Sequence, residues 1–424
     1  MTILIKKARV IDPTQKLDRI SDILIGDGKI KKLALSINEK ADTVIDGADC
    51  IAAPGFIDMH VHFRDPGFEY KEDIITGARA ALKGGFTSVA CMANTKPVCD
   101  TPEVVRYIKD KALETHVNVY PVAAMTKGLR GEEMTDIKAL KAAGAIAVSD
   151  DGRPVENSKM MLDVLRSADD NNILSIAHSE DLSLVDGGVI NEGRVSSEFG
   201  LRGMSRMAEY MAVTRDVMLS IPKKNRLHIA HVSCRESVEA IRWAKTLNPN
   251  ITCETAPHYV SLTENNVMKL GVNAKMNPPL RTQEDVDAVI EGLRDGTIDA
   301  IATDHAPHSE EDKGELSKGA FGIVGLETAL PVCYTYLVAA GKMSIRKLIR
   351  LMSTNPAAIL GIEGGSLTTG SRADIVIFDT EEHKVNRANF ASKSKNTPFD
   401  GMTLRGRVLC TISNGELVYK SEMI

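Results

Sequence analysis

Short apolar segments alternate with helical patterns through most of this 424-residue chain, and this alternation limits the fold more than any other feature. Helical stretches such as KEDIITGARAALKGG and SVEAIRWAKTL separate the apolar segments. Because strands that alternate with helices form a parallel sheet, eight such units predict a (β/α)8 TIM-like barrel, here over residues 54–361. The eight strand candidates are IAAPGFIDMHVHF, TSVACMA, VNVYPVAAM, AIAVSDDG, ILSIAHSE, RLHIAHVS, ITCETAPHY and DAIATDHAP.

Both ends of the chain have the pattern of short strands. Segments such as ILIKKARVID and DILIGDGKIKKLA at one end, and SRADIVIFDT at the other, alternate apolar and polar residues between turns. The dipeptide Asn414-Gly415 is typical of a hairpin turn. Neither end is large enough to bury a core alone. We therefore expect residues 1–53 and 362–424 to form one small β-sandwich domain.

Composition excludes several classes of protein. Hydrophobic residues make up 43% and charged residues 26%, as in globular domains. A net charge of −5 and 4% aromatic residues give no basis for a nucleic-acid partner. The sequence has no apolar run of the roughly 18 residues that a membrane span needs, and a membrane partner is not expected. Seven scattered cysteines without a C-x-x-C pair indicate reduced thiols and a cytoplasmic location.

Histidine and aspartate recur at the carboxyl ends of the predicted barrel strands. In such a barrel these ends form the catalytic face, where side chains from different strands converge. His60 and His62 are two residues apart, so on a strand they point to the same side. Imidazole and carboxylate are ligands that Zn²⁺ prefers, so we predict a zinc centre at this rim. Its six candidate ligands are His60, His62, Asp151, His178, His231 and Asp304.

The chemistry of such a centre follows from its carboxylates. Asp151 is the candidate from the middle of the barrel and the natural bridge between two ions, although neighbouring Asp150 could take its role. Two bridged ions can lower the pKa of a shared water toward roughly 7. Asp304 could then take a proton and pass it to a leaving nitrogen. The pattern therefore predicts hydrolysis of an amide, or the reverse reaction.

A second group of polar residues at the rim suits an anionic substrate. Arg64 follows the His-x-His pair, Asn94 ends the second strand and Asn277 follows the seventh. A guanidinium and two amides can bind a carboxylate and carbonyl groups. The alternatives are turn chemistry near proline for the asparagines and a salt bridge from Arg64 to Asp65.

The sequence indicates a role in the site less strongly for the remaining histidines. His228 should face away from His231, and His305 away from Asp304. His258 could contact the ligand residues without binding the metal itself. His308 lies in the charged loop HAPHSEEDKGE, which is either a mobile lid or a solvated loop. Two others are expected at the surface, His116 and His383.

An ordered set of motifs in this chain resembles the bacterial dihydroorotases of the amidohydrolase superfamily. The resemblance covers nearly the whole chain and is nearest to the longer bacterial type with a flanking β domain. Ala93 stands where proline is common, and Tyr259 where a second histidine is common. The motifs are DMHVHFRDPG, MANTKP, SDDG, AHSED, HIAHVS, MNPPLR, TDHAPH, FGIVGLET and STNPAAILGI.

The resemblance implies an activity and a role for each site residue. The family reversibly cyclises N-carbamoyl-L-aspartate to L-dihydroorotate in de novo pyrimidine (UMP) biosynthesis. By resemblance, one Zn²⁺ is held by His60, His62 and Asp304 and a second by His178 and His231. Asp151 bridges them in place of the carboxylated lysine of related enzymes, and this shorter bridge leaves one ion per chain as an alternative. Asp304 is the catalytic acid/base. The implied substrate contacts are His62, Arg64, Asn94, Asn277, His308, Phe321 and Gly322.

Two other functions compete with this interpretation. One is another cyclic-amidase activity, that of a hydantoinase or an allantoinase, whose substrates lack the carboxylate. The other is an inactive dihydroorotase-like scaffold for aspartate transcarbamoylase, which the complete set of candidate ligands disfavours. The resemblance also implies a homodimer and, in some members, association with aspartate transcarbamoylase.

Overall fold

The computed structural model describes residues 2–422, and its centre is a parallel barrel. A bridge between Val61 and His305 joins the first strand to the segment after the last, and the His62 amide donates to the His305 carbonyl at 2.8 Å. The predicted (β/α)8 fold is confirmed, and each of the eight predicted segments contains one barrel strand. In spatial order the strands are β6 (Phe56–Val61), β7 (Phe86–Cys91), β8 (Asn118–Ala123), β9 (Ala147–Val148), β10 (Leu174–Ala177), β13 (Leu227–Ile229), β14 (Ile251–Thr255) and β15 (Ala300–Ile301).

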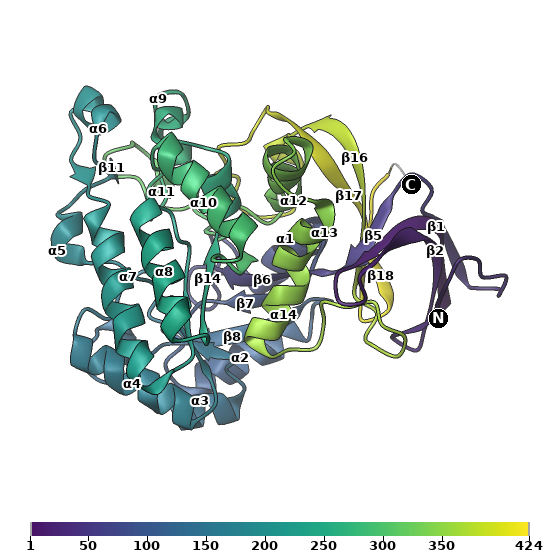
Figure 1. The fold of residues 1–424 in the computed structure, drawn as a ribbon, viewed down its shortest axis with the longest axis horizontal. Coiled ribbons are helices and arrows are strands. Elements are labelled where there is room, and N and C mark those ends of the chain that lie inside the picture. The colour runs from purple at the N-terminus through teal and green to yellow at the C-terminus, as the bar shows by residue number, and fades with distance from the viewer. Residues whose placement is uncertain (1, 423–424) are drawn as a thin grey trace.

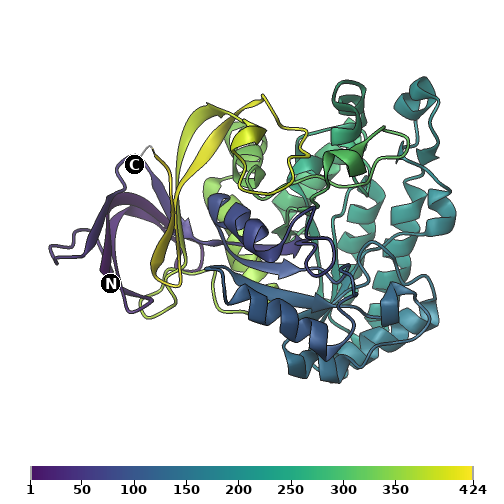
Figure 2. The same ribbon diagram turned by 180° about the vertical axis from the view of Figure 1, so that it is seen from behind.

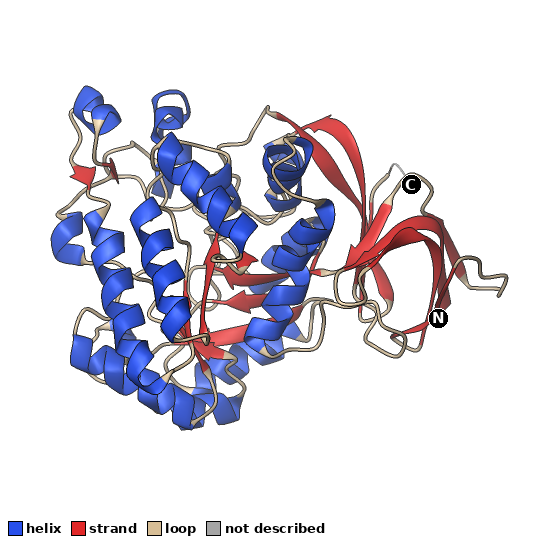
Figure 3. Ribbon diagram, viewed as in Figure 1, coloured by secondary structure: helices blue, strands red, loops and turns tan. Residues whose placement is uncertain are grey.

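Helices cover the outside of the barrel (Figures 1 and 3). Their inward faces follow the helical period: in the helix at 235–247, Val238, Ile241 and Ala244 are buried. Asp73 caps the first helix through the Thr76 amide, which fixes where that helix begins. The covering helices are α1 (Ile74–Lys83), α2 (Pro102–Ala112), α3 (Ile137–Ala143), α4 (Ser158–Asp170), α7 (Met207–Ser220), α8 (Arg235–Leu247), α10 (Gln283–Asp295), α12 (Ala329–Cys333), α13 (Ile345–Ile349) and α14 (Asn355–Leu360).

Short elements occupy the loops that follow the barrel strands. The connection between β10 and α7 is the most elaborate, with two small helices and a two-stranded pair. No helix within residues 2–422 is long and apolar enough to cross a membrane. The loop elements are α5 (Leu182–Val185), β11 (Ile190–Asn191), α6 (Arg194–Phe199), β12 (Gly203–Met204), α9 (Val267–Leu270) and α11 (Glu310–Lys313).

The two ends of the chain meet in a second sheet, beside the barrel, where both termini lie (Figure 1). β5 and β16 pair antiparallel, from Ile375 opposite Pro54 to Phe378 opposite Ile51, and so join the N-terminal strands to the C-terminal ones. The β domain built from both termini is thus confirmed. Its strands are β1 (Thr2–Asp12), β2 (Leu17–Gly26), β3 (Lys29–Ala34), β4 (Thr43–Asp46), β5 (Ile51–Pro54), β16 (Ile375–Lys384), β17 (Thr403–Ser413) and β18 (Glu416–Lys420).

This second sheet is continuous and curls around its own core. Ile3 and Ile23 of its N-terminal half pack in one cluster with Ile377 and Ile412 of its C-terminal half. The two halves therefore enclose apolar side chains like the layers of a sandwich. Phe378 belongs to the barrel core instead, and its ring lies 6.3 Å from that of Phe56.

The connection between β16 and β17 leaves the sheet and reaches the barrel rim (Figure 2). Within it, Phe399 packs in a cluster with Tyr259 and Ile323 of the barrel loops. Asn396 accepts a hydrogen bond from the His308 amide at 3.1 Å and donates to the Gly322 carbonyl at 3.1 Å. A C-terminal segment thus helps to shape the rim where the polar residues gather.

Candidate active site

The six predicted ligand residues converge at the carboxyl ends of the barrel strands, with Asp151 at their centre. Asp151 Oδ1 lies 3.3 Å from His60 Nε2, 3.3 Å from His178 Nδ1 and 3.5 Å from His231 Nε2. Asp151 Oδ2 lies 3.4 Å from His62 Nε2. Burial alone would raise the pKa of Asp151, but the surrounding imidazoles hold it well below its usual range. Asp151 is therefore a carboxylate shared by two histidine pairs.

Asp304 completes one side of this cluster. Its Oδ1 lies 3.1 Å from His62 Nε2 and 3.6 Å from His60 Nε2. Asp304 and His231 have left-handed backbone conformations, with φ of 49° and 37°. Non-glycine residues hold such conformations only where the surrounding structure enforces them. The backbone is thus turned at two strand ends so that these side chains face the cluster.

The contacts on the outer nitrogens of the histidines determine which lone pairs face inward. His62 Nδ1 lies 2.8 Å from Asn94 Oδ1, and His60 Nδ1 lies 3.0 Å from Glu254 Oε1. Since these oxygens accept, each Nδ1 carries a proton, and once the rings are neutral their Nε2 lone pairs face Asp151.

A cation bound between these imidazole nitrogens and the Asp151 oxygens would satisfy acceptors that otherwise face one another. Both His60 Nε2 and Asp151 Oδ1 are buried without a hydrogen-bond partner. Two groups have their ligand atoms within 4.8 Å of one another: His60, His62 and Asp151, and Asp151, His178 and His231. Imidazole nitrogens and carboxylate oxygens with facing lone pairs form a donor set that fits divalent metal ions.

The structure distinguishes Asp151 from its neighbour Asp150. Asp150 points away from the imidazoles and accepts hydrogen bonds from the amides of Met125 at 2.7 Å and Thr126 at 3.0 Å. It also accepts from the Thr126 hydroxyl. Asp150 therefore anchors the loop after β8, which leaves Asp151 as the carboxylate in the cluster.

A chain of buried groups extends from His60 below the cluster. Glu254 on β14 contacts His60 Nδ1 through one oxygen, and its other oxygen lies 3.3 Å from His228 Nε2. His228 Nδ1 in turn lies 2.8 Å from Thr252 Oγ1. The prediction that His228 faces away from the site is wrong. The strand ends at Ile229 and the left-handed turn at His231 breaks the alternation on which that prediction relied.

Sequence reasoning missed Glu254 and a second supporting carboxylate, Glu180. Glu180 Oε2 lies 3.3 Å from His178 Nε2, the nitrogen opposite the cluster, and although burial alone would raise the pKa of Glu180, the contact with His178 helps to lower it. A signal for Glu254 was present, because a glutamate inside the apolar strand ITCET needs a buried partner.

A cavity of about 270 Å³ opens over the cluster, and every predicted substrate-contact residue borders it. Arg64 is only 9% exposed, and within residues 2–422 no carboxylate pairs with it. The alternative of a salt bridge to Asp65 is wrong, because Asp65 accepts from Tyr107 Oη at 2.8 Å instead. The lining residues are His62, Arg64, Asn94, Asp151, Gly152, His178, His231, Asn277, Asp304, Ala306, His308, Phe321 and Gly322.

The other histidines have separate environments. His305 points into the barrel wall, where its Nδ1 accepts from the Gly325 amide at 3.1 Å. His258 is buried, and burial lowers its pKa to about 4. His308 itself is buried at 8% exposure, whereas Glu310, Glu311 and Glu315 of the same loop are exposed. His116 lies near Glu416 and is exposed. His383 lies on β16 and is partly exposed.

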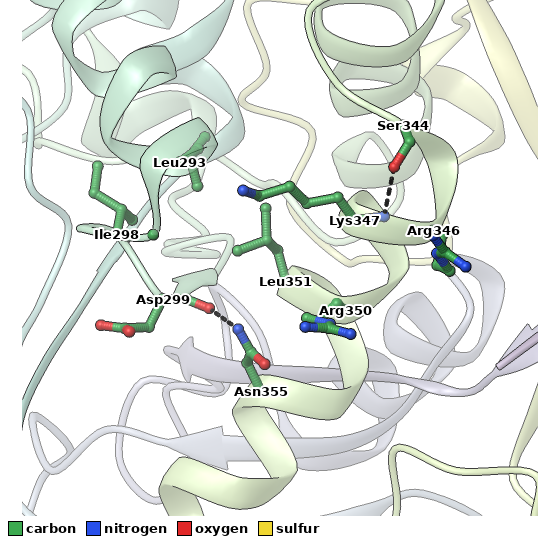
Figure 4. A pocket seen from close by; sticks show the side chains of 10 residues that line it. Leu293, Ile298, Asp299, Ser344, Arg346, Lys347, Arg350, Leu351 and Asn355 are labelled. Carbon is green, nitrogen blue, oxygen red and sulfur yellow. Dashed lines mark hydrogen bonds between the residues drawn. The ribbon is translucent and has the colours of Figure 1, made fainter. Parts of the chain in front are cut away.

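A larger cavity of about 370 Å³ lies before β15, at the amino-terminal end of the strand whose carboxyl end leads to Asp304 (Figure 4). Two of its polar groups are engaged in structural contacts: Asn355 donates to the Asp299 carbonyl at 2.7 Å, and Asp299 pairs with Lys245. None of the predicted site residues borders this cavity.

Comparison with known proteins agrees with this geometry. The family model described as dihydro-orotase-like matches residues 50–237, and that of the amidohydrolase family matches residues 235–419. A dihydroorotase from Geobacter metallireducens is 51% identical, with 99% of this chain and all of the relative covered. One from Ruminiclostridium cellulolyticum is 49% identical, and both chains are covered completely.

Solved structures support the same fold. An L-hydantoinase (dihydropyrimidinase) from Arthrobacter aurescens superposes with a TM-score of 0.90 at 25% identity, covering 99% of this chain and 96% of that one. A dihydropyrimidinase from Brevibacillus agri, at 21% identity, has a TM-score of 0.84 and covers 99% and 95%. With full-length relatives at about half identity, the chain belongs to the dihydroorotase family of the amidohydrolases.

Proposed function

We propose that this protein catalyses the reversible cyclisation of N-carbamoyl-L-aspartate to L-dihydroorotate, a step of de novo pyrimidine biosynthesis. One observation carries the proposal: two histidine pairs share Asp151, and the same cavity holds a buried arginine that pairs with no carboxylate of residues 2–422. The first feature suits hydrolysis of an amide, and the second suits a substrate that brings its own carboxylate.

The proposed metal is Zn²⁺, two ions per chain, with a single ion as the alternative. His60, His62 and Asp304 would hold one ion, His178 and His231 the other, and Asp151 would bridge them. When bound, the ions supply Lewis acidity toward the ring carbonyl and a water molecule. Glu254 and Glu180 orient the imidazoles from outside, which keeps the inner lone pairs directed at the ions.

Asp304 is proposed as the catalytic acid/base. Burial alone would raise its pKa, but the contact with His62 and the nearby charge of His60 hold that pKa below its usual value. Asp304 is therefore a carboxylate that can accept a proton. In the hydrolytic direction it takes a proton from the attacking water as the new C–O bond forms. It returns that proton to the ring nitrogen as the C–N bond breaks, which gives the free carbamoyl amide.

The cavity residues are proposed to hold the substrate. Arg64 and His308 bind the carboxylate that does not react, while Asn94 and Asn277 bind ring polar groups. His62 also borders the substrate, and Phe321 and Gly322 contribute backbone groups.

Two variants test the proposal. Asp304→Ala should abolish turnover of L-dihydroorotate while leaving the unfolding transition in place. Arg64→Ala should raise the KM for L-dihydroorotate by at least about tenfold, the loss of one charge-assisted contact. The second candidate activity is that of a hydantoinase, which the structural likeness to an L-hydantoinase favours. Turnover of hydantoin that exceeds that of dihydroorotate and is unchanged in Arg64→Ala would favour this candidate.

Several further properties are proposed from family resemblance. They are a division of the chain into residues 1–53 with 362–424 and residues 54–361, a cytoplasmic location, a homodimer and an association with aspartate transcarbamoylase. A light-scattering mass equal to one chain of 46.0 kDa would contradict the dimer.

A further inference from the structure

The imidazole of His308 lies between two cations. Its Nε2 is 3.2 Å from Arg64 Nη2, and its Nδ1 is 3.4 Å from Lys71 Nζ. Guanidinium and ammonium groups can only donate hydrogen bonds, whereas a neutral imidazole has one accepting nitrogen. One ring nitrogen of His308 must therefore carry a hydrogen that faces a donor.

The ammonium of Lys71 is fixed on the outer side of this ring. Lys71 Nζ lies 3.3 Å from Asp312 Oδ2, and it stands 5.5 Å from the ring centroids of both Phe68 and Tyr70. Its side chain is only 15% exposed. Arg64 and His308 border the cavity, whereas Lys71 does not. His308 Nε2, the nitrogen beside Arg64, is therefore the one on the substrate side.

We propose that Lys71 is a positioning residue for substrate recognition. Its ammonium donates to His308 Nδ1, so the ring proton stays on Nε2 and faces the cavity beside Arg64. Arg64 Nη2 and His308 Nε2 then form a pair of donors that face each other, while Arg64 Nε donates to the Pro307 carbonyl at 3.3 Å. A carboxylate oxygen of the substrate would accept from this pair. This inference rests on the proposed function, because it assigns to Lys71 a role in binding the substrate carboxylate.

The arrangement makes the site selective for anions. With Nε2–H and the guanidinium aimed at one point, a ligand without an acceptor there leaves two buried donors unsatisfied, which is costly. A carboxylate accepts both bonds and also compensates the positive charge of Arg64. Without Lys71 the ring could instead accept from Arg64 through Nε2, and the pair of donors would be lost.

A purely structural role for Lys71 is the competing explanation. Lys71 and Asp312 join two loops, since Asp312 also accepts from the Ser309 amide at 3.3 Å within the short helix α11. If this ion pair alone mattered, Asp312→Asn would have the same effect as removal of Lys71. If Lys71 acts through His308, Asp312→Asn should leave substrate binding nearly intact, because the amide keeps an oxygen that can still accept from Lys71 Nζ.

Steady-state kinetics with L-dihydroorotate on the zinc-loaded protein separate these explanations. Lys71→Met should raise KM by about tenfold or more and change kcat by less than about threefold. Lys71→Arg keeps a charged donor and should restore most of the affinity. Asp312→Asn is the matched control and should stay within about twofold of the wild type. A KM unchanged in Lys71→Met, or raised equally in Asp312→Asn, would overturn the inference.

A spectroscopic measurement tests the proton position independently of activity. Histidine-selective ¹⁵N spectra of the full-length protein distinguish the two neutral tautomers, and a His308→Asn variant assigns the signal. The wild type should have the proton of His308 on Nε2, and Lys71→Met should shift it toward Nδ1. A proton on Nδ1 in the wild type would overturn the inference even if the enzyme is active. A wild type that fails to turn over dihydroorotate would instead refute the proposed function.

Discussion

Glu254 offers a demanding test of how the barrel interior supports the metal site. Its carboxylate lies 3.0 Å from His60 Nδ1 and 3.3 Å from His228 Nε2, and its side chain is 1% exposed. Contacts with the two histidines outweigh burial and lower the pKa of Glu254 to about 2, so it is a carboxylate at neutral pH. It therefore holds the ring of His60 and adds negative charge behind it.

The magnitude follows from the contacts that each substitution removes. Loss of an outer partner of a metal ligand typically weakens metal binding about 10–100-fold. Glu254→Gln keeps an oxygen that can accept from His60 but removes the charge, so we expect about a tenfold rise in the zinc dissociation constant. Glu254→Ala removes both contacts and should reach about a hundredfold, or about 2.7 kcal/mol.

Competition with a chromophoric chelator measures the dissociation constant, and denaturant unfolding measures stability in parallel. Asp285→Asn is a suitable control, because Asp285 is buried like Glu254 but caps α10 and pairs with Arg206, with no contact to the predicted ligands. The control should lower stability without weakening zinc binding. Zinc affinity within about twofold of the wild type in both Glu254 variants would refute this reasoning.

Three further predictions concern stability and reactivity. Phe378→Ala should lower the free energy of unfolding by about 3–5 kcal/mol in denaturant titration, because its buried ring packs near Phe56; a loss under about 1 kcal/mol would contradict this packing role. Burial and the nearby charge of Lys275 lower the pKa of Lys313 from 10.5 to about 7. The unfolded chain therefore binds an extra proton between these values, and stability should rise with pH across that window. The rise in the free energy of unfolding should be smaller in Lys313→Met. Identical pH profiles of stability in the variant and the wild type would contradict this role of Lys313. All seven cysteines are buried, so a thiol reagent should modify them only after unfolding; rapid reaction of any thiol in the native protein would oppose this.

The features that sequence predicted best were those that depend on local periodicity. Each apolar segment became a barrel strand because a short apolar run between helical stretches can be buried on both faces of a parallel sheet. His60 and His62 could be placed on one side of a strand for the same reason. Convergence of the six predicted ligands followed from the geometry of parallel barrels, in which all carboxyl ends meet at one rim.

Sequence failed where a contact joins segments that are distant along the chain. Lys71 meets His308 across 237 positions, and Asn396 meets it across 88. No local pattern indicates such pairs. His228 was misplaced for a different reason, since a single left-handed residue, His231, breaks the alternation. Only the structure shows whether Asp150 or Asp151 belongs to the ligand cluster, because the answer depends on which carboxylate the Met125 and Thr126 amides bind.

Metal analysis combined with activity tests the central claim most directly. The purified protein would be treated with a chelator, reloaded with Zn²⁺, and assayed for dihydroorotate hydrolysis by its ultraviolet absorbance, with elemental analysis of the same sample. We expect activity to disappear with the chelator and return as about two zinc ions bind per chain. One ion at full activity would remove the bridging role of Asp151. Full activity in the metal-free protein, or no turnover in the zinc-loaded one, would contradict the proposed mechanism.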